Sequence, residues 1–258
     1  MIVMNTEHLK QRLGDQGSVE AASLGDVDWR GIACDDAKFA DCLFQDAQFS
    51  DTVFAGAKFV RCQFVRCRFS HADLKEASYD ECVFVGRDDN VKGCAFAFSE
   101  LRNARFSRCD LSFCQIERSD LFCVEMDQCN LRGARFQKVD FSHAYSRKVV
   151  TTRASFQNCN FELADLSEVR LVGCELTGCR FREADLSSAD LTDAVLRDCD
   201  LFQALLTNAK FEGVDLRGAE ISGLNLMCLA SFGRMKVNQS QQHAILGGIG
   251  IDVHPEPV

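Results

Sequence analysis

The feature that most constrains the fold of this chain is a repeat of five residues. A large apolar residue recurs at nearly every fifth position from Trp29 to Phe84 and, after a change of phase, from Phe96 to Leu226. Of the 39 positions in these two series, 31 are Phe or Leu, and the residue two places earlier is Ala or Cys in 28 repeats. Self-similarity at a fixed period indicates stacked repeats rather than a globular domain.

A period of five fits neither an α-helix, with its period of 3.6, nor a strand, with its period of two. A backbone that turns one corner per repeat can point every large residue at a common axis. Successive coils then pair through their backbones at the strand spacing of about 4.8 Å. The large residues would fill the lumen, the small residues would sit near the corners, and the other three positions would face solvent. The presence of only 2 prolines agrees with a backbone committed to hydrogen-bonded ladders.

The cysteines follow the same repeat. Twelve of the 15 occupy the small position two residues before the large one. Their number is odd, and their spacing in multiples of five does not bring metal ligands to one point. We therefore predict free, buried cysteines that act as small apolar core residues.

The composition excludes several classes of protein. A net charge of −9 argues against direct nucleic-acid binding, whose footprint is basic. No uninterrupted apolar stretch reaches the roughly 18 residues of a membrane span, so no membrane partner is expected. The N-terminus lacks the pattern of a signal peptide, which predicts a cytoplasmic protein. The sequence shows no catalytic constellation, phosphate-binding loop or metal-ligand spacing, so we expect no enzyme, no catalytic residues, no metal and no cofactor.

Three segments carry a resemblance to a known family. Residues 164–167 and 184–187 read Ala-Asp-Leu-Ser, and residues 189–192 read Ala-Asp-Leu-Thr. They resemble the A-(D/N)-L-x-x signature of pentapeptide-repeat proteins. The resemblance implies an all-β fold, a right-handed quadrilateral β-helix with four repeats per coil, over residues 27–236. Residues 1–26 are then an N-terminal extension or cap, with a helix over 6–13 ended by Gly14, and residues 237–258 are a C-terminal capping and dimerisation segment.

Two interruptions of the repeat predict projecting loops. About seven residues are inserted within 85–93, where the phase changes. In the segment 146–155 the phase is kept, but Ser146 and Thr151 stand where Phe or Leu is expected, and hydroxyl residues are poor core. Local failure of a strict pattern is where function is expected. The residues that we predict to bind a partner through these loops are Arg87, Asp88, Asp89, Arg147, Lys148, Thr151, Thr152 and Arg153.

The C-terminal segment predicts a cap. Asn238 or Ser240 can begin a short helix that ends at Gly247 or Gly248. The alternation of Ile249, Ile251 and Val253 predicts a short strand. These apolar residues would cover the end of the rod or meet a second copy of the chain, since a two-fold dimer closes an open solenoid. The predicted homodimer interface consists of Ala244, Ile245, Leu246, Ile249 and Ile251.

The two loops and this tail are together similar to the Qnr group of pentapeptide-repeat proteins. Residues 92–94, 151–153 and 246–251 carry the likeness. The resemblance implies that DNA gyrase, topoisomerase IV or both are the partners and are protected from quinolones. The chain departs from the group by about 28 residues ahead of the first repeat and by a His-Pro-Glu-Pro extension after Val253. The roles of these two ends do not carry over.

The same family implies that the rod imitates DNA in the enzyme. Residues twenty apart would stack on one face, which predicts an acidic face of Glu100, Asp120, Asp140, Asp200 and Glu220, with Asn160 and Arg180 between. The repeat itself favours Asp and Asn at this position through local hydrogen bonds, so the column is not specific for mimicry. A structural or scaffold solenoid that binds an unrelated protein is the alternative function.

Overall fold

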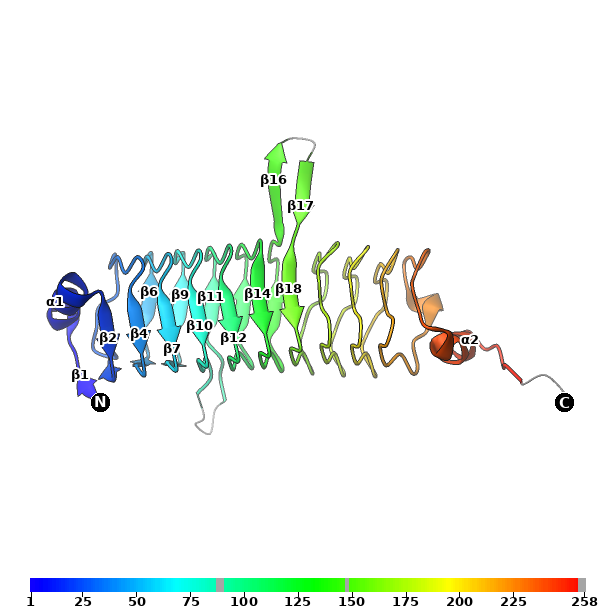
Figure 1. Ribbon diagram of the computed structural model, residues 1–258, viewed down its shortest axis with the longest axis horizontal. Helices are drawn as coiled ribbons and strands as arrows, with labels where there is room; N and C mark the ends of the chain where they lie inside the picture. The colour runs from blue at the N-terminus through cyan, green and yellow to red at the C-terminus, as the bar shows by residue number, and fades with distance from the viewer. Residues whose placement is uncertain (87–90, 147–148, 255–258) are drawn as a thin grey trace.

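The computed structural model describes residues 1–86, 91–146 and 149–254, which form a long rod (Figure 1). The rod is a four-sided, right-handed β-helix whose faces are built from short parallel strands and single bridges. An arm stands out from its middle, and a short helix lies at each end (Figure 1). The predicted all-β quadrilateral β-helix with a short C-terminal helix is confirmed. In the described part of the chain, no helix has the length and apolar character needed to cross a bilayer.

Four columns of parallel pairs, one per face, hold the coils together. Face 1 contains β2 (Ser18–Glu20), β4 (Lys38–Ala40), β7 (Lys58–Val60), β10 (Ser78–Asp80), β12 (Arg105–Ser107), β14 (Val124–Asp127) and β18 (Ala154–Gln157). Face 2 contains β1 (Ile2–Val3), β3 (Ala22–Ser23), β5 (Leu43–Gln45) and β8 (Gln63–Val65). Face 3 contains β6 (Gln48–Ser50), β9 (Arg68–Ser70), β11 (Ala95–Ala97), β13 (Gln115–Glu117) and β15 (Arg135–Gln137). Face 4 and the C-terminal coils are joined by single bridges, such as Ala33 with Val53 and Asp200 with Glu220.

A residue in the left-handed conformation makes each corner of a coil. It lies two positions after the large residue, as at Asp41 (φ 53°) and Asp46 (φ 55°). The Asp41 N–H donates to the carbonyl of Val60 in the next coil at 2.9 Å. None of the described non-glycine residues in this conformation is Val, Ile or Thr, because β-branched side chains clash there. The residue at each corner directs its side chain outward, which explains why Phe98 and Phe113 are exposed.

The large residues fill the lumen as stacks of side chains along the axis. On face 1 the rings of Phe39, Phe59 and Tyr79 are stacked, with centroids 5.0 and 4.8 Å apart. Toward the C-terminal half, Leu replaces Phe at most lumen positions, and every lumen residue from Leu166 to Leu201 is buried. The core is thus one continuous column, as stacking of identical repeats requires.

The ladder reaches further toward the N-terminus than the predicted boundary at residue 27. Strand β2 pairs with β4, and β1 pairs with β3, so the segment 1–26 already contributes to the coils. Val19 and Leu24 are buried and continue the five-residue register back from Trp29.

Helix α1 (Thr6–Gln16) covers the N-terminal end of the rod (Figure 1). Its Leu9 is fully buried, and Leu13 packs against the core, so a helix in this segment is confirmed. The predicted end at Gly14 is wrong. The helix continues to Gln16 and stops at Gly17, whose left-handed backbone (φ 61°) lets its N–H donate to the carbonyl of Leu13.

Eight cysteines form a file along the corner between faces 1 and 2. Each thiol lies near the carbonyl oxygen of a lumen residue in the preceding coil, for example Cys109 Sγ with Tyr79 O at 3.4 Å. The file consists of Cys42, Cys62, Cys82, Cys109, Cys129, Cys159, Cys179 and Cys199. All 15 cysteines are free, so the predicted role as core residues is confirmed for those that are buried.

The assignment of inside and outside positions predicts unequal effects of substitution. Phe161→Asp or Leu186→Asp places a charge in the lumen without a partner, and we expect a loss of more than about 4 kcal/mol or local unfolding. Lys210→Ala removes only an exposed ion pair with Asp190 and should cost less than about 1 kcal/mol. Urea unfolding followed by circular dichroism measures both values. Equal losses for the two kinds of variant would contradict the fold.

The cysteine environments predict a simple labelling pattern. Thirteen thiols are buried, Cys123 is half-buried and Cys228 is exposed. At Cys34 and Cys174, burial also raises the pKa of the thiol to about 12, so little thiolate is present at these two residues. A thiol reagent at pH 8 should label Cys228 rapidly, Cys123 slowly and all 15 residues only in denaturant. Rapid labelling of a third cysteine in the native protein, counted by mass spectrometry, would contradict the closed lumen.

Candidate functional site

The segment predicted to leave the coil forms an arm of two antiparallel strands. Strand β16 (Ser142–Ser146) pairs with β17 (Val149–Thr152), with a bulge between Ala144 and Ser146. The chain leaves the rod after the buried Phe141 and returns at the buried Ala154. At the foot, the Arg153 N–H donates to the Phe141 carbonyl at 3.0 Å. The arm therefore stands at the corner between faces 4 and 1 (Figure 1).

Aromatic side chains hold the foot of the arm against the rod. Phe122, which is buried, lies 5.2 Å from the ring of His143 and 6.5 Å from that of Tyr145. Further out, Tyr145, Val149 and Val150 are more than half exposed. An arm that carries exposed apolar side chains away from the rod is suited to contact another protein.

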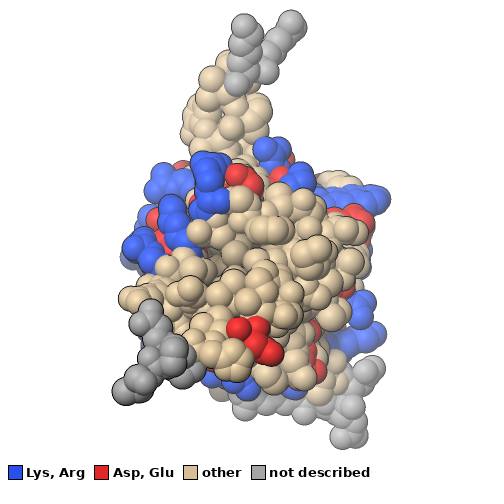
Figure 2. Space-filling view, turned by 90° about the vertical axis from the view of Figure 1, so that its right-hand side faces the viewer, with Lys and Arg blue, Asp and Glu red and all other residues tan. Residues whose placement is uncertain are grey.

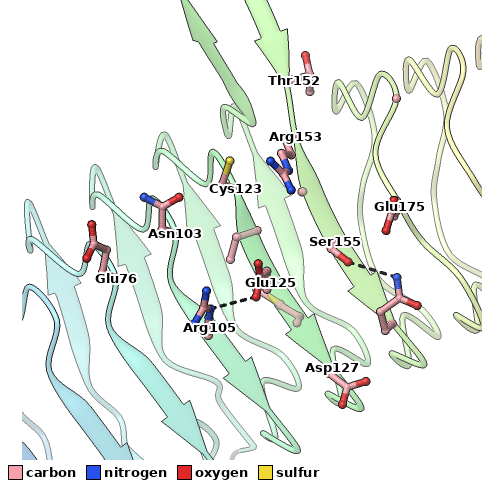
Figure 3. Close-up of a pocket in the computed structure, with 15 residues that line it drawn as sticks. Glu76, Asn103, Arg105, Cys123, Glu125, Asp127, Thr152, Arg153, Ser155 and Glu175 are labelled. Carbon is pink, nitrogen blue, oxygen red and sulfur yellow. Dashed lines mark hydrogen bonds and ion pairs between the residues drawn. The ribbon is translucent and has the colours of Figure 1, made fainter.

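A groove of about 990 Å³ lies beside the foot of the arm on face 1 (Figure 3). Arg105 and Glu125 form an ion pair of 3.0 Å across neighbouring coils, and Ser155 accepts a hydrogen bond from Gln157 at 3.2 Å. Arg153 lies near Cys123 at the arm side of the groove (Figure 3). Burial raises the pKa of the Cys123 thiol, and the Arg153 guanidinium acts in the opposite direction. The groove thus carries both signs of charge.

The structure places the predicted arm residues as follows. Thr151 and Thr152 lie on β17, and Arg153 lies at the foot of the arm. Ser146 and Thr151 are both exposed, which agrees with the prediction that this segment leaves the lumen. Arg147 and Lys148 lie outside the described residues.

The other predicted loop leaves the rod between faces 2 and 3. Val85 forms an antiparallel bridge with Gly93, and the Gly86 N–H donates to the Lys92 carbonyl at 3.2 Å. The Cys94 N–H donates to the Phe84 carbonyl at 2.8 Å, where the chain rejoins the rod. The two projections therefore arise from opposite corners of the rod. Arg87, Asp88 and Asp89 lie outside the described residues.

The predicted single acidic face is wrong. Glu100, Asp120 and Asp140 do stack on face 4, next to Asp73. Asp200 and Glu220 instead belong to face 2, because Asn160 pairs with Asn130, thirty residues earlier. The arm removes the equivalent of two repeats from the coil, so a step of twenty residues changes face when it crosses the arm.

Basic side chains partly neutralise both groups of carboxylates. Lys75 pairs with Asp73 at 3.3 Å and also with Glu100. Arg102 pairs with Asp120 at 2.5 Å on face 4, and Arg182 pairs with Asp200 on face 2. Such partly exposed pairs contribute about 0–1 kcal/mol each, but they reduce the negative potential that a basic partner would meet.

The C-terminal segment closes the rod. After the short helical turn η1 (Leu226–Cys228), the chain forms η2 (Gln239–Gln241) and α2 (Gln242–Gly248). Gln241 is buried, and its Nε2 donates to the carbonyls of Leu216 and Ala219 at 2.8 and 2.7 Å. Its Oε1 accepts from the Asn238 N–H at 2.6 Å, so one side chain joins the cap to the last coils.

The predicted interface residues divide between this cap and the surface. Ala244 and Ile245 pack against the core, and Leu246 is half-buried. Ile249 and Ile251 are 38 % and 48 % exposed. The predicted strand over 249–253 is wrong, because these residues find no strand partner within the described chain. Seen from this end, the centre of the rod carries few charged side chains (Figure 2).

Sequence reasoning missed the strands of the arm and its aromatic foot. The β-branched run Val149, Val150, Thr151 and Thr152 is typical of a strand and could have predicted β17. Phe122 gave no signal, because it occupies an outward position and contacts the arm only in the folded chain.

Comparisons with known proteins match both halves of the chain to the same repeat. The model of the pentapeptide repeat region matches residues 149–226, and the model of pentapeptide repeats in eight copies matches residues 34–70 and 90–122. The quinolone resistance pentapeptide repeat protein QnrB96 of Scandinavium goeteborgense is 32 % identical over 87 residues, which are 34 % of this chain. That match spans 38 % of the length of QnrB96.

Solved structures extend the likeness along the rod. Full-length QnrB1, described as a plasmid-mediated fluoroquinolone resistance protein, is similar with a TM-score of 0.78 and 25 % identity, over 83 % of this chain and 100 % of QnrB1. A trypsin-treated variant of QnrB1 is similar with a TM-score of 0.76 and 26 % identity, over 83 % of this chain and 99 % of that one. By its repeats, its fold and these relatives, the chain belongs to the pentapeptide-repeat proteins and is Qnr-like.

Proposed function

We propose that this protein binds DNA gyrase, topoisomerase IV or both and protects them from quinolones. The observation that carries the proposal is the likeness to full-length QnrB1, a fluoroquinolone resistance protein, over the whole length of that protein. The targets are those that the resemblance to the Qnr group implies. A rod with a filled lumen offers its surface and projections rather than a catalytic pocket, which suits protection by binding.

The arm is the projection best placed to contact the enzyme. Tyr145, Val149 and Val150 present exposed apolar surface on the arm, and Phe122 holds the base of the arm in place. A few residues carry most of the binding energy in protein interfaces, and tyrosine and arginine are enriched among them. Arg147 and Lys148 add positive charge to the same segment of the sequence.

Charge mimicry of DNA has a smaller part in this proposal. The carboxylates of Glu100, Asp120 and Asp140 lie on face 4, next to the corner from which the arm departs. They could steer the rod toward a basic groove in the enzyme. Because Lys75 and Arg102 neutralise part of this face, we assign specificity to the arm and steering to the carboxylates.

Deletions that keep the repeat in register can test this function. Removing residues 144–153 joins Phe141 to Phe156 with a spacing of five, and removing residues 87–93 does the same for Phe84 and Phe96. Both variants should keep a complete rod. In a gyrase supercoiling assay with ciprofloxacin, we expect the intact protein to restore supercoiling and the 144–153 deletion to need at least about tenfold more protein.

Lys58→Ala on face 1 is the matched control and should protect like the intact protein, since it changes an exposed residue away from both projections. The melting temperatures of the variants, measured by circular dichroism, show whether the rod persists. Failure of the folded, intact protein to restore supercoiling at any concentration would overturn the proposal. Full protection by the arm deletion would refute only the role of the arm.

The protein is proposed to act as a homodimer joined at its C-terminal ends. Ile249 and Ile251 are exposed beside the cap, and the centre of this end carries few charges (Figure 2). Pairing two such ends would bury the apolar surface that each cap leaves exposed. Ala244, Ile245 and Leu246 would then support the interface from beneath, since they pack on or near the core.

Placing acids at this end should separate the subunits. We expect Ile249→Asp with Ile251→Asp to shift the mass from dimer to monomer in size-exclusion chromatography with light scattering, because two charges would face their copies. Ile2→Asp with Val3→Asp makes the same change at exposed residues of the opposite end and should leave the dimer intact. A monomeric intact protein, or a dimer dissociated equally by both pairs, would contradict the C-terminal interface.

A further inference from the structure

A second groove, of about 540 Å³, lies on face 3 at the root of the loop that leaves after Phe84. Twelve described residues line it; four of them are cationic and none is acidic. The cations are Arg66, Arg68, Lys92 and Arg135. This concentration of positive charge is notable on a chain whose net charge is −9.

The repeat and the loop together build the hollow. Ala95 lies on face 3 and pairs with Arg68 on one side and Gln115 on the other. Its small side chain leaves space at the bottom of the groove. Gly93 lies so close to the rod that a Cβ there would be 2.3 Å from the Cys114 nitrogen. The exposed ring of Phe113 lies against Gly133, where a Cβ would meet it at 2.8 Å, and forms one wall. The two glycines therefore shape the groove.

Most of its positive charge is uncompensated. Arg66 pairs with Asp46 through two contacts of 2.6 and 2.8 Å. Arg68 donates to the hydroxyl of Ser70, at 3.2 Å. Within residues 1–86, 91–146 and 149–254, no carboxylate forms an ion pair with Arg68, Lys92 or Arg135. Exposed cations without partners, gathered in a concave surface, attract anions.

The spacing of the two arginines indicates the shape of the anion. Arg68 and Arg135 are three ladder steps apart along face 3, through Ala95 and Gln115, which is about 14 Å at the usual strand spacing. In an extended peptide, residues four apart on the same side are separated by about 13 Å. Two carboxylates at such positions could each reach one arginine, with the intervening side chain between Ala95 and Gln115.

We propose that this groove binds an extended acidic segment of a partner protein, with carboxylates four residues apart paired to Arg68 and Arg135. A nucleic acid is less suited to it. Duplex DNA carries about one negative charge per 1.7 Å, so a long polyanion would meet the net negative charge of the rest of the rod. A short acidic segment meets only the groove. The groove lies at the corner opposite the arm, so this contact is separate from the one proposed for the arm.

Fluorescence anisotropy with a labelled peptide of alternating glutamate and serine tests the proposal on the full-length protein. We expect binding at low salt that weakens as salt rises and disappears when glutamine replaces glutamate in the peptide. Arg68→Glu with Arg135→Glu should weaken binding at least about tenfold. The matched control, Lys38→Glu with Lys58→Glu, makes the same charge change at ladder neighbours on face 1 and should stay within about twofold of the intact protein.

Gln115→Glu, which adds a carboxylate between the two arginines, gives a second variant should the double reversal fail to fold, and it should also weaken binding. Three results would overturn the proposal: no binding of the glutamate peptide by the intact protein, equal weakening by the face 1 control, or tighter binding of a single-stranded oligonucleotide that the arginine variants abolish. These readouts require no topoisomerase, so they are independent of the proposed function.

Discussion

Every part of this structure depends on keeping the large side chains of all coils pointed into one lumen while the backbone of each coil bonds to the next. The left-handed residue at each corner makes this possible, because it turns the chain and directs its own N–H to the following coil, as Asp41 does with Val60. A lumen residue such as Phe59 then stacks on its equivalents above and below. Since neighbouring coils make all the contacts, stability accumulates along the rod, and each coil needs the phase of its neighbours.

The projections are the places where the chain leaves this register and regains it. The loop after Phe84 inserts seven residues, and Asp73 accordingly pairs with Glu100 rather than with a residue twenty positions later. The arm takes out a whole number of repeats, so the period continues through it unchanged, but Asn160 now stacks on Asn130. An excursion of a whole number of repeats leaves the five-residue period unchanged, yet it moves every later residue to another face of the rod.

This shift decides which charges act together. Asp200 and Glu220 share the predicted series with Glu100 but lie on another side of the rod. Basic residues from adjacent coils then pair with the carboxylates, as Arg102 does with Asp120. The surfaces that we propose for partners are local: the apolar arm, the basic groove at the opposite corner, and the C-terminal end. A Qnr-like protein that works through such surfaces can keep one rod and vary its contacts by changing outward residues alone.

The sequence by itself determined the β-helix, the buried cysteines and the positions of both interruptions, because each follows from a spacing of five that only a cornered coil can satisfy. It also marked residues 1–26 and 237–258 as segments that cap the rod, although not how Gln241 bonds to the last coils. Only the tertiary structure decided which residues share a face, since stacking depends on how many residues each excursion removes. Only the folded chain likewise brings Phe122 beneath the arm and places Arg68 and Arg135 along one groove. These residues come from different coils, so the number of residues in the intervening coils decides whether they meet.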